Sequence, residues 1–125
     1  MLNEDTPQVL AAETMRERIG REEWDDAATH FTGGVTFRVG NHGPVHGFAE
    51  IRSYLAWQAS KAAWEGDHVR TKISEHDLVV MEVESSFRRS ADGAQIVLPV
   101  VNVYRFDRLL IAEWLVYGDL SPLEG

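Results

Sequence analysis

Four strand-like runs joined by short turns fill the second half of the chain, and they restrict the possible folds more than any other feature. Each run is rich in β-branched and aromatic residues, and the turns between them carry Gly, Asp or His. Strands that follow one another across such short turns pair as antiparallel neighbours. The pattern predicts strands at residues 69–75, 78–89, 95–106 and 110–119.

The first half of the chain alternates between helical and extended patterns. A Thr6-Pro7 pair is typical of a helix start, and apolar residues then recur at helical spacing up to Gly20. This order predicts an α+β domain with a mainly antiparallel sheet, in which residues 1–125 form one domain. We expect helices at 7–20, 22–31 and 47–63, a strand at 35–39 and a turn-rich loop at 40–44.

Composition excludes several classes of partner. The 125 residues carry a formal net charge of -8, so nucleic acid and anionic membranes would be repelled over most of the surface. The chain has no Cys, which leaves out disulfides and thiolate metal sites. The N-terminal segment lacks a basic region followed by an apolar core, and no apolar run approaches transmembrane length. We therefore expect a cytoplasmic protein without nucleic-acid or membrane partners.

The last predicted strand ends in an acid. Alternation along this strand places five residues on one face: Ile111, Glu113, Leu115, Tyr117 and Asp119. A carboxylate buried on an apolar face has either a partner or a raised pKa, and a raised pKa suits proton transfer. We interpret Asp119 as a candidate general acid or base with the hydroxyl of Tyr117 beside it. The alternative is that Asp119 caps the strand end in solvent.

The predicted strand at 95–106 is apolar on both of its alternating faces. A strand of this kind is covered on both sides. The helices cover one face, and no predicted element remains for the other face, which Ala112, Trp114 and Val116 continue on the last strand. We predict a homodimer through this outer sheet face. The alternative is a sheet curled enough to bury both faces within one chain.

Five segments carry a resemblance to a known family: residues 37–40, 47–51, 92–93, 98–99 and 110–119. Together with the order of elements, they resemble the SnoaL-like branch of the nuclear transport factor 2-like superfamily. The resemblance implies a cone-shaped α+β barrel, in which a curved sheet wraps a long helix and leaves a deep apolar pocket. Relatives include polyketide cyclases, ketosteroid isomerases, limonene epoxide hydrolases and scytalone dehydratases, alongside binding proteins without catalysis.

Residue by residue, the resemblance carries over only in part. Asp119 matches the strand-end aspartate that acts as acid or base in polyketide cyclases. His68 lies about where scytalone dehydratase-like proteins have a pocket histidine. Phe37 stands where the epoxide hydrolases have a tyrosine, and their arginine and aspartate fall near Val83 and Ser85. The machinery of the epoxide hydrolases is therefore not reproduced.

Two function hypotheses follow. The first is an enzyme that uses acid/base chemistry of the cyclase, isomerase, dehydratase or hydrolase type on a hydrophobic, oxygenated substrate, without a cofactor. The alternative is a non-catalytic binding or transport protein for a small hydrophobic molecule. His42 and His46 share a Gly-Pro loop, which does not indicate a metal site. The candidate catalytic residues are Asp119, His68 and Tyr117, and the candidate substrate-binding residues are Asn102, Tyr54, Trp57, Phe37, Phe87, Met81 and Trp24.

Overall fold

Two helices of 14 residues form the helical side of the molecule. The structure, a computed structural model, describes residues 5–124. The N-terminal segment, in which we expect no secretory signal, begins outside these residues. Helix α1 (Pro7–Gly20) starts at a cap, where the Thr6 hydroxyl accepts from the backbone N–H of Val9 at 3.2 Å. A short α2 (Trp24–Ala28) follows, and α3 (Phe48–Lys61) comes after the first two strands.

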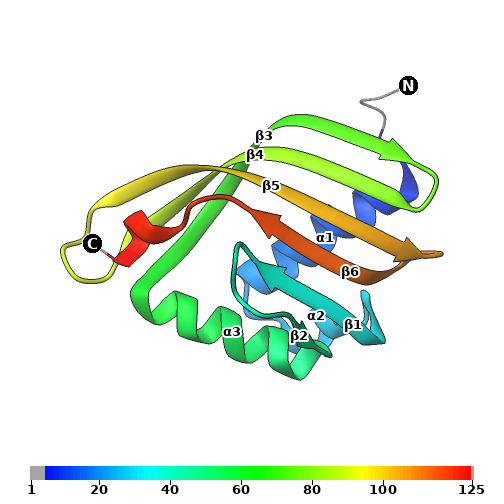
Figure 1. The fold of residues 1–125 in the computed structure, drawn as a ribbon, viewed down its shortest axis with the longest axis horizontal. Coiled ribbons are helices and arrows are strands. Elements are labelled where there is room, and N and C mark those ends of the chain that lie inside the picture. The colour runs from blue at the N-terminus through cyan, green and yellow to red at the C-terminus, as the bar shows by residue number, and fades with distance from the viewer. Residues whose placement is uncertain (1–4, 125) are drawn as a thin grey trace.

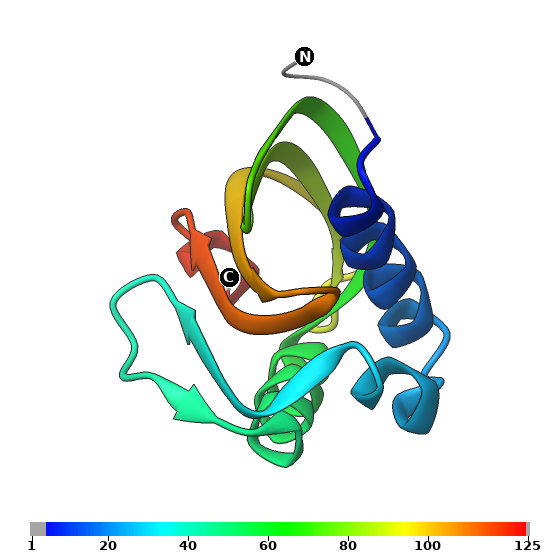
Figure 2. The ribbon, with the colours of Figure 1, turned by 90° about the vertical axis from the view of Figure 1, so that its right-hand side faces the viewer.

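Six strands form one sheet in the order β2-β1-β6-β5-β4-β3. The pair β1 and β6 is parallel and the other four pairs are antiparallel. Figures 1 and 2 show the sheet curling toward the side on which α1 and α3 lie. The edge strands β2 and β3 do not pair in the described sheet, so the barrel is open. The strands are β1 (Phe31–Val39), β2 (Val45–His46), β3 (Ala62–Glu75), β4 (Leu78–Arg89), β5 (Gln95–Asp107) and β6 (Leu110–Tyr117), followed by the 3-10 turn η1 (Ser121–Glu124).

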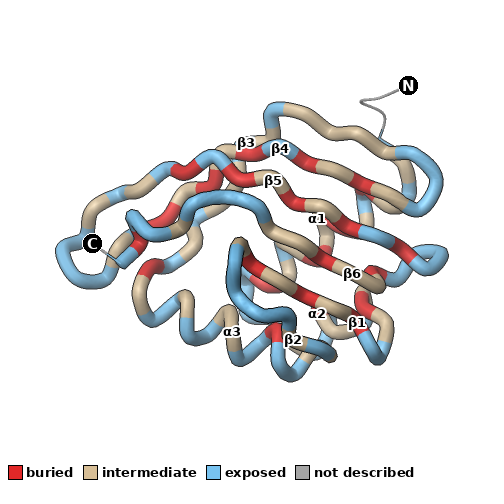
Figure 3. Tube along the Cα trace, in the orientation of Figure 1, coloured by how far each residue is buried: buried red, intermediate tan, exposed pale blue. Residues whose placement is uncertain are grey.

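The concave face of the sheet and the helices enclose the core. Helix α1 contributes the apolar stripe that the sequence predicts, and α3 contributes Ile51. Buried positions alternate with intermediate or exposed ones along β4 and β5, as Figure 3 shows, because successive side chains point to opposite faces. The predicted α+β class with a curved, mainly antiparallel sheet is confirmed.

A bulge in β6 changes which side chains face the interior. The pairing with β5 skips Ala112, so the alternation shifts by one residue at this point. Ile111 and Trp114 are both buried, with 0% and 2% of their surface exposed. Glu113 lies on the outer face, where its carboxylate forms an ion pair with Arg105 at 3.1 Å.

This bulge makes two of our expectations about faces wrong. Leu115 and Tyr117, predicted on the same face as Ile111, lie on the outer face opposite Val103 and Val101 of β5. Trp114, predicted on the outer face, points inward instead. A single unpaired residue is enough to exchange the two faces, because the side-chain period of a strand is two.

Two element boundaries also differ from the prediction. The second helix ends at Ala28, since Phe31 already begins β1 and pairs with Ile111 of β6. The Gly33-Gly34 pair, expected to stop this helix, lies inside β1 instead. Strand β3 begins at Ala62, well before the predicted start at residue 69. Because the strand starts earlier, residues 62–68 also belong to β3, and each of their side chains points to one defined face of the sheet.

The outer face of the sheet is apolar at its centre. Val101, Val103 and Leu115 lie there, flanked by Val97 and Tyr117, which are 50% and 44% exposed. Homodimer formation through this face therefore stays a prediction, now with these residues instead of Trp114.

None of the helices in the described part of the chain is long and apolar enough to cross a membrane.

We expect the wild-type protein to have the mass of a dimer in size-exclusion chromatography with light scattering, because a second copy would cover this apolar face. Val101→Lys places a charge at its centre and should weaken association at least about tenfold, since a buried unpaired charge is strongly unfavourable. Ser90→Lys, on the exposed β4–β5 turn, is the matched control. A monomeric wild type at micromolar concentration would contradict the prediction.

Candidate functional site

Two adjoining cavities lie at one end of the sheet. The outer one, here the mouth cavity, lies between α3, the end of β6 and the loop after β1, and it has a volume of about 730 Å³. The inner cavity, of about 40 Å³, lies deeper among α1, β4, β5 and β6. The two therefore form one funnel that narrows toward the interior. Four residues line both cavities: Val39, Tyr54, Gln58 and Leu120.

Aromatic rings form a continuous wall along this funnel. Trp114 in the interior packs on Phe37 with 4.7 Å between ring centroids, and Phe37 meets the edge of Tyr54 at 5.5 Å. Tyr54 contacts Trp57 at 5.5 Å, and His42 stands 6.2 Å from Tyr54 at the mouth. Burial raises the pKa of Tyr54, so its phenol stays neutral. A wall of this kind suits a ligand with flat apolar rings.

A partly buried arginine, Arg16, is the only charged residue among the described residues that line the inner cavity. The guanidinium of Arg16, from α1, lies 4.2 Å from the ring centre of Trp64 and 5.3 Å from that of Trp114. It forms an ion pair with Asp67 at 3.6 Å, and the two side chains are 18% and 13% exposed. The Nε of Arg16 has no hydrogen-bond partner among residues 5–124. The charge is therefore paired while one N–H donor remains free.

Asp67 is fixed against this guanidinium by its neighbours. Its Oδ1 accepts a hydrogen bond from Nε1 of Trp64 at 2.9 Å and another from the hydroxyl of Ser85. The same indole nitrogen lies 3.2 Å from Oγ of Ser85. Trp64 packs closely on Gly20 at the end of α1, where an added Cβ would lie 2.7 Å from the ring. The carboxylate of Asp67 is thus held in one orientation.

A buried amide supplies a second donor to the inner cavity. Oδ1 of Asn102 accepts from Nε1 of Trp114 at 3.0 Å. An indole nitrogen can only donate, so this bond assigns the amide oxygen, and Nδ2 points elsewhere. Asn102 is 4% exposed and lines the inner cavity, and no hydrogen bond from Nδ2 is found within residues 5–124; because Nδ2 is not among the fully buried atoms that lack a partner, it keeps some accessible surface. The inner cavity therefore presents N–H donors, and no carboxylate of the described residues lines it.

The mouth cavity carries charges of both signs, from Arg38, Lys61, Asp119 and Glu124. Asp119 is exposed, because β6 ends two residues earlier, and its Oδ1 accepts from the backbone N–H of Ser121 at 3.0 Å. Hydrogen bonds from the Ser121 side chain and backbone hold the pKa of Asp119 below its ordinary value. The predicted raised pKa is therefore wrong: Asp119 lies exposed at the end of the strand, as the alternative interpretation expects, and a role in proton transfer stays a prediction.

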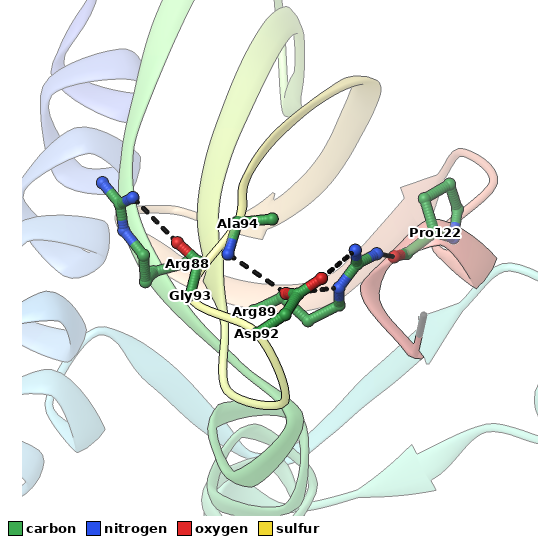
Figure 4. Close-up of polar contacts among 6 residues, drawn as sticks. All are labelled: Arg88, Arg89, Asp92, Gly93, Ala94 and Pro122. Atoms are coloured by element: carbon green, nitrogen blue, oxygen red, sulfur yellow. Dashed lines mark hydrogen bonds and ion pairs between the residues drawn. The ribbon is translucent and has the colours of Figure 1, made fainter.

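A C-terminal strap, residues 120–124, is fastened across the mouth. Figure 4 shows Arg89 of β4 donating to the backbone oxygen of Pro122 at 2.8 Å while it also binds both carboxylate oxygens of Asp92, at 3.0 and 2.7 Å. The hydrogen bond from Arg89 lowers the pKa of Asp92 to about 2. This attachment keeps Leu120 at the constriction between the two cavities.

The structure brings most of the predicted site residues together in the funnel. The mouth cavity contains Asp119, Tyr117 and Trp57, the inner cavity contains Asn102, Phe37 and Phe87, and Tyr54 lines both. Although Tyr117 lies on the outer sheet face, its hydroxyl reaches the mouth, where it accepts from Arg38 at 3.3 Å.

Three predicted residues lie outside the funnel. His68 pairs with Glu84 in the sheet and shares its outer face, because the register of β3 turns Asp67 inward instead. Met81 is a core residue, 4% exposed, and Trp24 packs on Phe48 with 6.3 Å between ring centroids. None of the three lines the mouth cavity or the inner cavity, so the structure does not bring them together with the other candidate residues.

Three residues of the inner site were not predicted from the sequence. Arg16 carries a signal, since it lies at a position of the apolar stripe of α1 where a charge is unusual. Ser85 alternates with Met81 and Val83, which also indicates an inward position. Asp67 gives no such signal, because the preceding Gly66 and the mixed residues around it hide the start of β3. No group of three or more metal-ligating side chains is present within residues 5–124.

Several solved structures share the fold of this chain. An NTF2-like protein of unknown function from Burkholderia pseudomallei is 12% identical with a TM-score of 0.80, covering 94% of this chain and 95% of that chain. TerC, crystallised with polyporic acid, is 16% identical with a TM-score of 0.83, covering 96% and 100%. An LEH-like epoxide hydrolase from M. tuberculosis is 14% identical with a TM-score of 0.75, covering 91% and 84%.

The sequence itself identifies the family. The SnoaL-like domain family matches residues 12–114, which is most of the chain. The protein therefore belongs to the SnoaL-like domain family, as the resemblance in the sequence indicates. No curated protein sequence matches the chain.

Proposed function

We propose that the protein binds a small, mainly apolar molecule through an acceptor oxygen that reaches the inner cavity. The observation that carries this proposal is the pair of free donors at the end of the funnel, Nδ2 of Asn102 and Nε of Arg16. Nε of Arg16 is the fully buried one of the two, and a buried donor without a partner is unfavourable by roughly 1–3 kcal/mol. An oxygen atom of a ligand in the inner cavity would accept a hydrogen bond from Nδ2 of Asn102, with the positive charge of Arg16 in the same lining.

The volumes of the two cavities agree with a ligand whose apolar part lies in the mouth cavity and whose oxygen lies in the inner cavity. The mouth cavity of about 730 Å³ is within the range of roughly 300–1,000 Å³ typical of small-molecule sites. The inner cavity of about 40 Å³ accommodates only a small polar group. Apolar rings would therefore lie against Tyr54 and Trp57, with the oxygen directed past Leu120.

The similar proteins support a role with small molecules. TerC was crystallised with polyporic acid, and the M. tuberculosis protein is described as an epoxide hydrolase. At 16% and 14% identity these similarities support the fold, and the nature of the ligand rests on the donors of this chain.

A cytoplasmic location remains a prediction.

A panel of three naphthalenes tests the binding proposal: 2-acetylnaphthalene, 2-naphthoate and 2-ethylnaphthalene, followed by tryptophan fluorescence and calorimetry. We expect at least one of the two oxygen-bearing probes to bind about tenfold more tightly than the hydrocarbon, the effect of about 1.4 kcal/mol expected for one or two hydrogen bonds. Asn102→Asp keeps the acceptor for Trp114 but replaces the free donor, and it should remove this preference. Equal affinity for all three probes would contradict the proposal.

A second candidate function is proton abstraction from carbon next to a carbonyl group. The observation that favours it is the placement of Asp119 in the mouth and of the donors in the inner cavity, on opposite sides of the shared constriction. The donors would stabilise the enolate oxygen, while the carboxylate of Asp119 would take the proton. The lowered pKa makes Asp119 a weak base, so we expect slow turnover.

Exchange of the α-protons of 1-tetralone in deuterated buffer, followed by NMR, tests this second candidate. Asp119→Asn should reduce the protein-catalysed rate at least about a hundredfold, the usual contribution of a general base. Because the pKa of Asp119 is held below its ordinary value, the rate should be constant near neutral pH and fall only as the pH drops toward this lowered pKa. Asp107→Asn, at the exposed end of β5, is the control. If the α-protons of 1-tetralone exchange no faster with the protein than in buffer alone, the second candidate function is wrong and only the binding proposal remains.

A further inference from the structure

We infer that Asp67 is the specificity-determining residue of the inner cavity, and that it makes this cavity select a neutral acceptor oxygen over a carboxylate. The inference deepens the proposed binding function and rests on it. It concerns a residue that does not itself line either cavity. Asp67 would act through Arg16, whose charge it cancels.

The charges around the inner cavity support this role. Arg16 is the charged residue among the described lining residues, and its guanidinium is paired with Asp67 at 3.6 Å. Glu13, one turn earlier on α1, is paired with Lys72 at 3.0 Å. Tyr104, which stacks on Trp114, stays neutral because burial raises its pKa strongly. The interior therefore holds no net charge that could balance an additional anion.

A carboxylate and a carbonyl would meet this environment differently. A carboxylate would lose its hydration and lie near the fixed negative charge of Asp67, and both effects are unfavourable. A neutral carbonyl oxygen needs only the free N–H group of Asn102. Its entry leaves the ion pair undisturbed.

Asp67 cannot move away to release Arg16 for a second anion. Its Oδ1 is held by Trp64 and Ser85, and Trp64 is in turn packed against Gly20 and the guanidinium. The stacking of Arg16 between two indole rings fixes the other partner. The selectivity is thus built into the arrangement of the side chains and not into the size of the cavity.

The wild-type protein gives the first test, with 2-acetylnaphthalene and 2-naphthoate as probes of nearly equal size. We expect the ketone to bind at least about tenfold more tightly in calorimetry, because the carboxylate enters without a free counter-charge. Equal or tighter binding of 2-naphthoate would overturn the inference while leaving the binding proposal intact. Binding of neither probe, or equal binding of 2-ethylnaphthalene, would overturn both.

The variant Asp67→Asn tests whether Asp67 is the cause. It leaves Arg16 unpaired, so affinity for 2-naphthoate should rise at least about tenfold while affinity for the ketone changes less than about threefold. Asp107→Asn should show wild-type selectivity. The double variant Arg16→Gln with Asp67→Asn removes both charges and should again exclude 2-naphthoate.

Thermal unfolding keeps this test decisive if Asp67→Asn is unstable. Millimolar 2-naphthoate should then raise the unfolding temperature of Asp67→Asn and not that of the double variant, because the bound anion would pair with Arg16. An Asp67→Asn protein that stays unfolded with 2-naphthoate, or that keeps wild-type selectivity, would overturn the inference.

Discussion

The interior of this protein depends on the contacts of one guanidinium group, that of Arg16. It lies between the rings of Trp64 and Trp114 and is paired with Asp67, so it connects α1 with β3 and β6. Each stacking contact of this kind contributes about 0.5–2 kcal/mol, but an unpaired buried charge is unfavourable by roughly 3–5 kcal/mol. The ion pair therefore stabilises the fold as long as Arg16 is charged, and it leaves the inner end of the funnel without net charge.

The bulge at Ala112 determines which residues can reach this interior. It turns Trp114 inward, where its indole N–H binds Asn102, and it turns Glu113 outward to Arg105. Without the shift, the face of β6 that carries Tyr117 would line the core and Trp114 would face solvent. The donor set of the inner cavity thus follows from one extra residue in one strand.

The sequence was sufficient to predict the fold class and most helices and strands, because the spacing of apolar residues indicates the buried face of an element over many residues at once. Strand β4 and the helix α3 follow their predicted patterns closely. The site was less predictable, since a bulge or an early strand start reverses facing without changing composition, as Ala112 and His68 illustrate. The pairing of Arg16 with Asp67 joins residues from distant parts of the chain, and a single sequence contains no signal for such a contact.

The central claim is that the inner cavity presents free N–H donors to an acceptor. A crystal structure of the ligand-free protein at about 1.2 Å resolution tests it most directly, because ordered water is visible there and the amide of Asn102 can be assigned. The account predicts a water molecule within hydrogen-bond distance of Nδ2 of Asn102, since a cavity of about 40 Å³ with polar walls holds one. A dry cavity, or one filled by the side chain of Leu120, would contradict it.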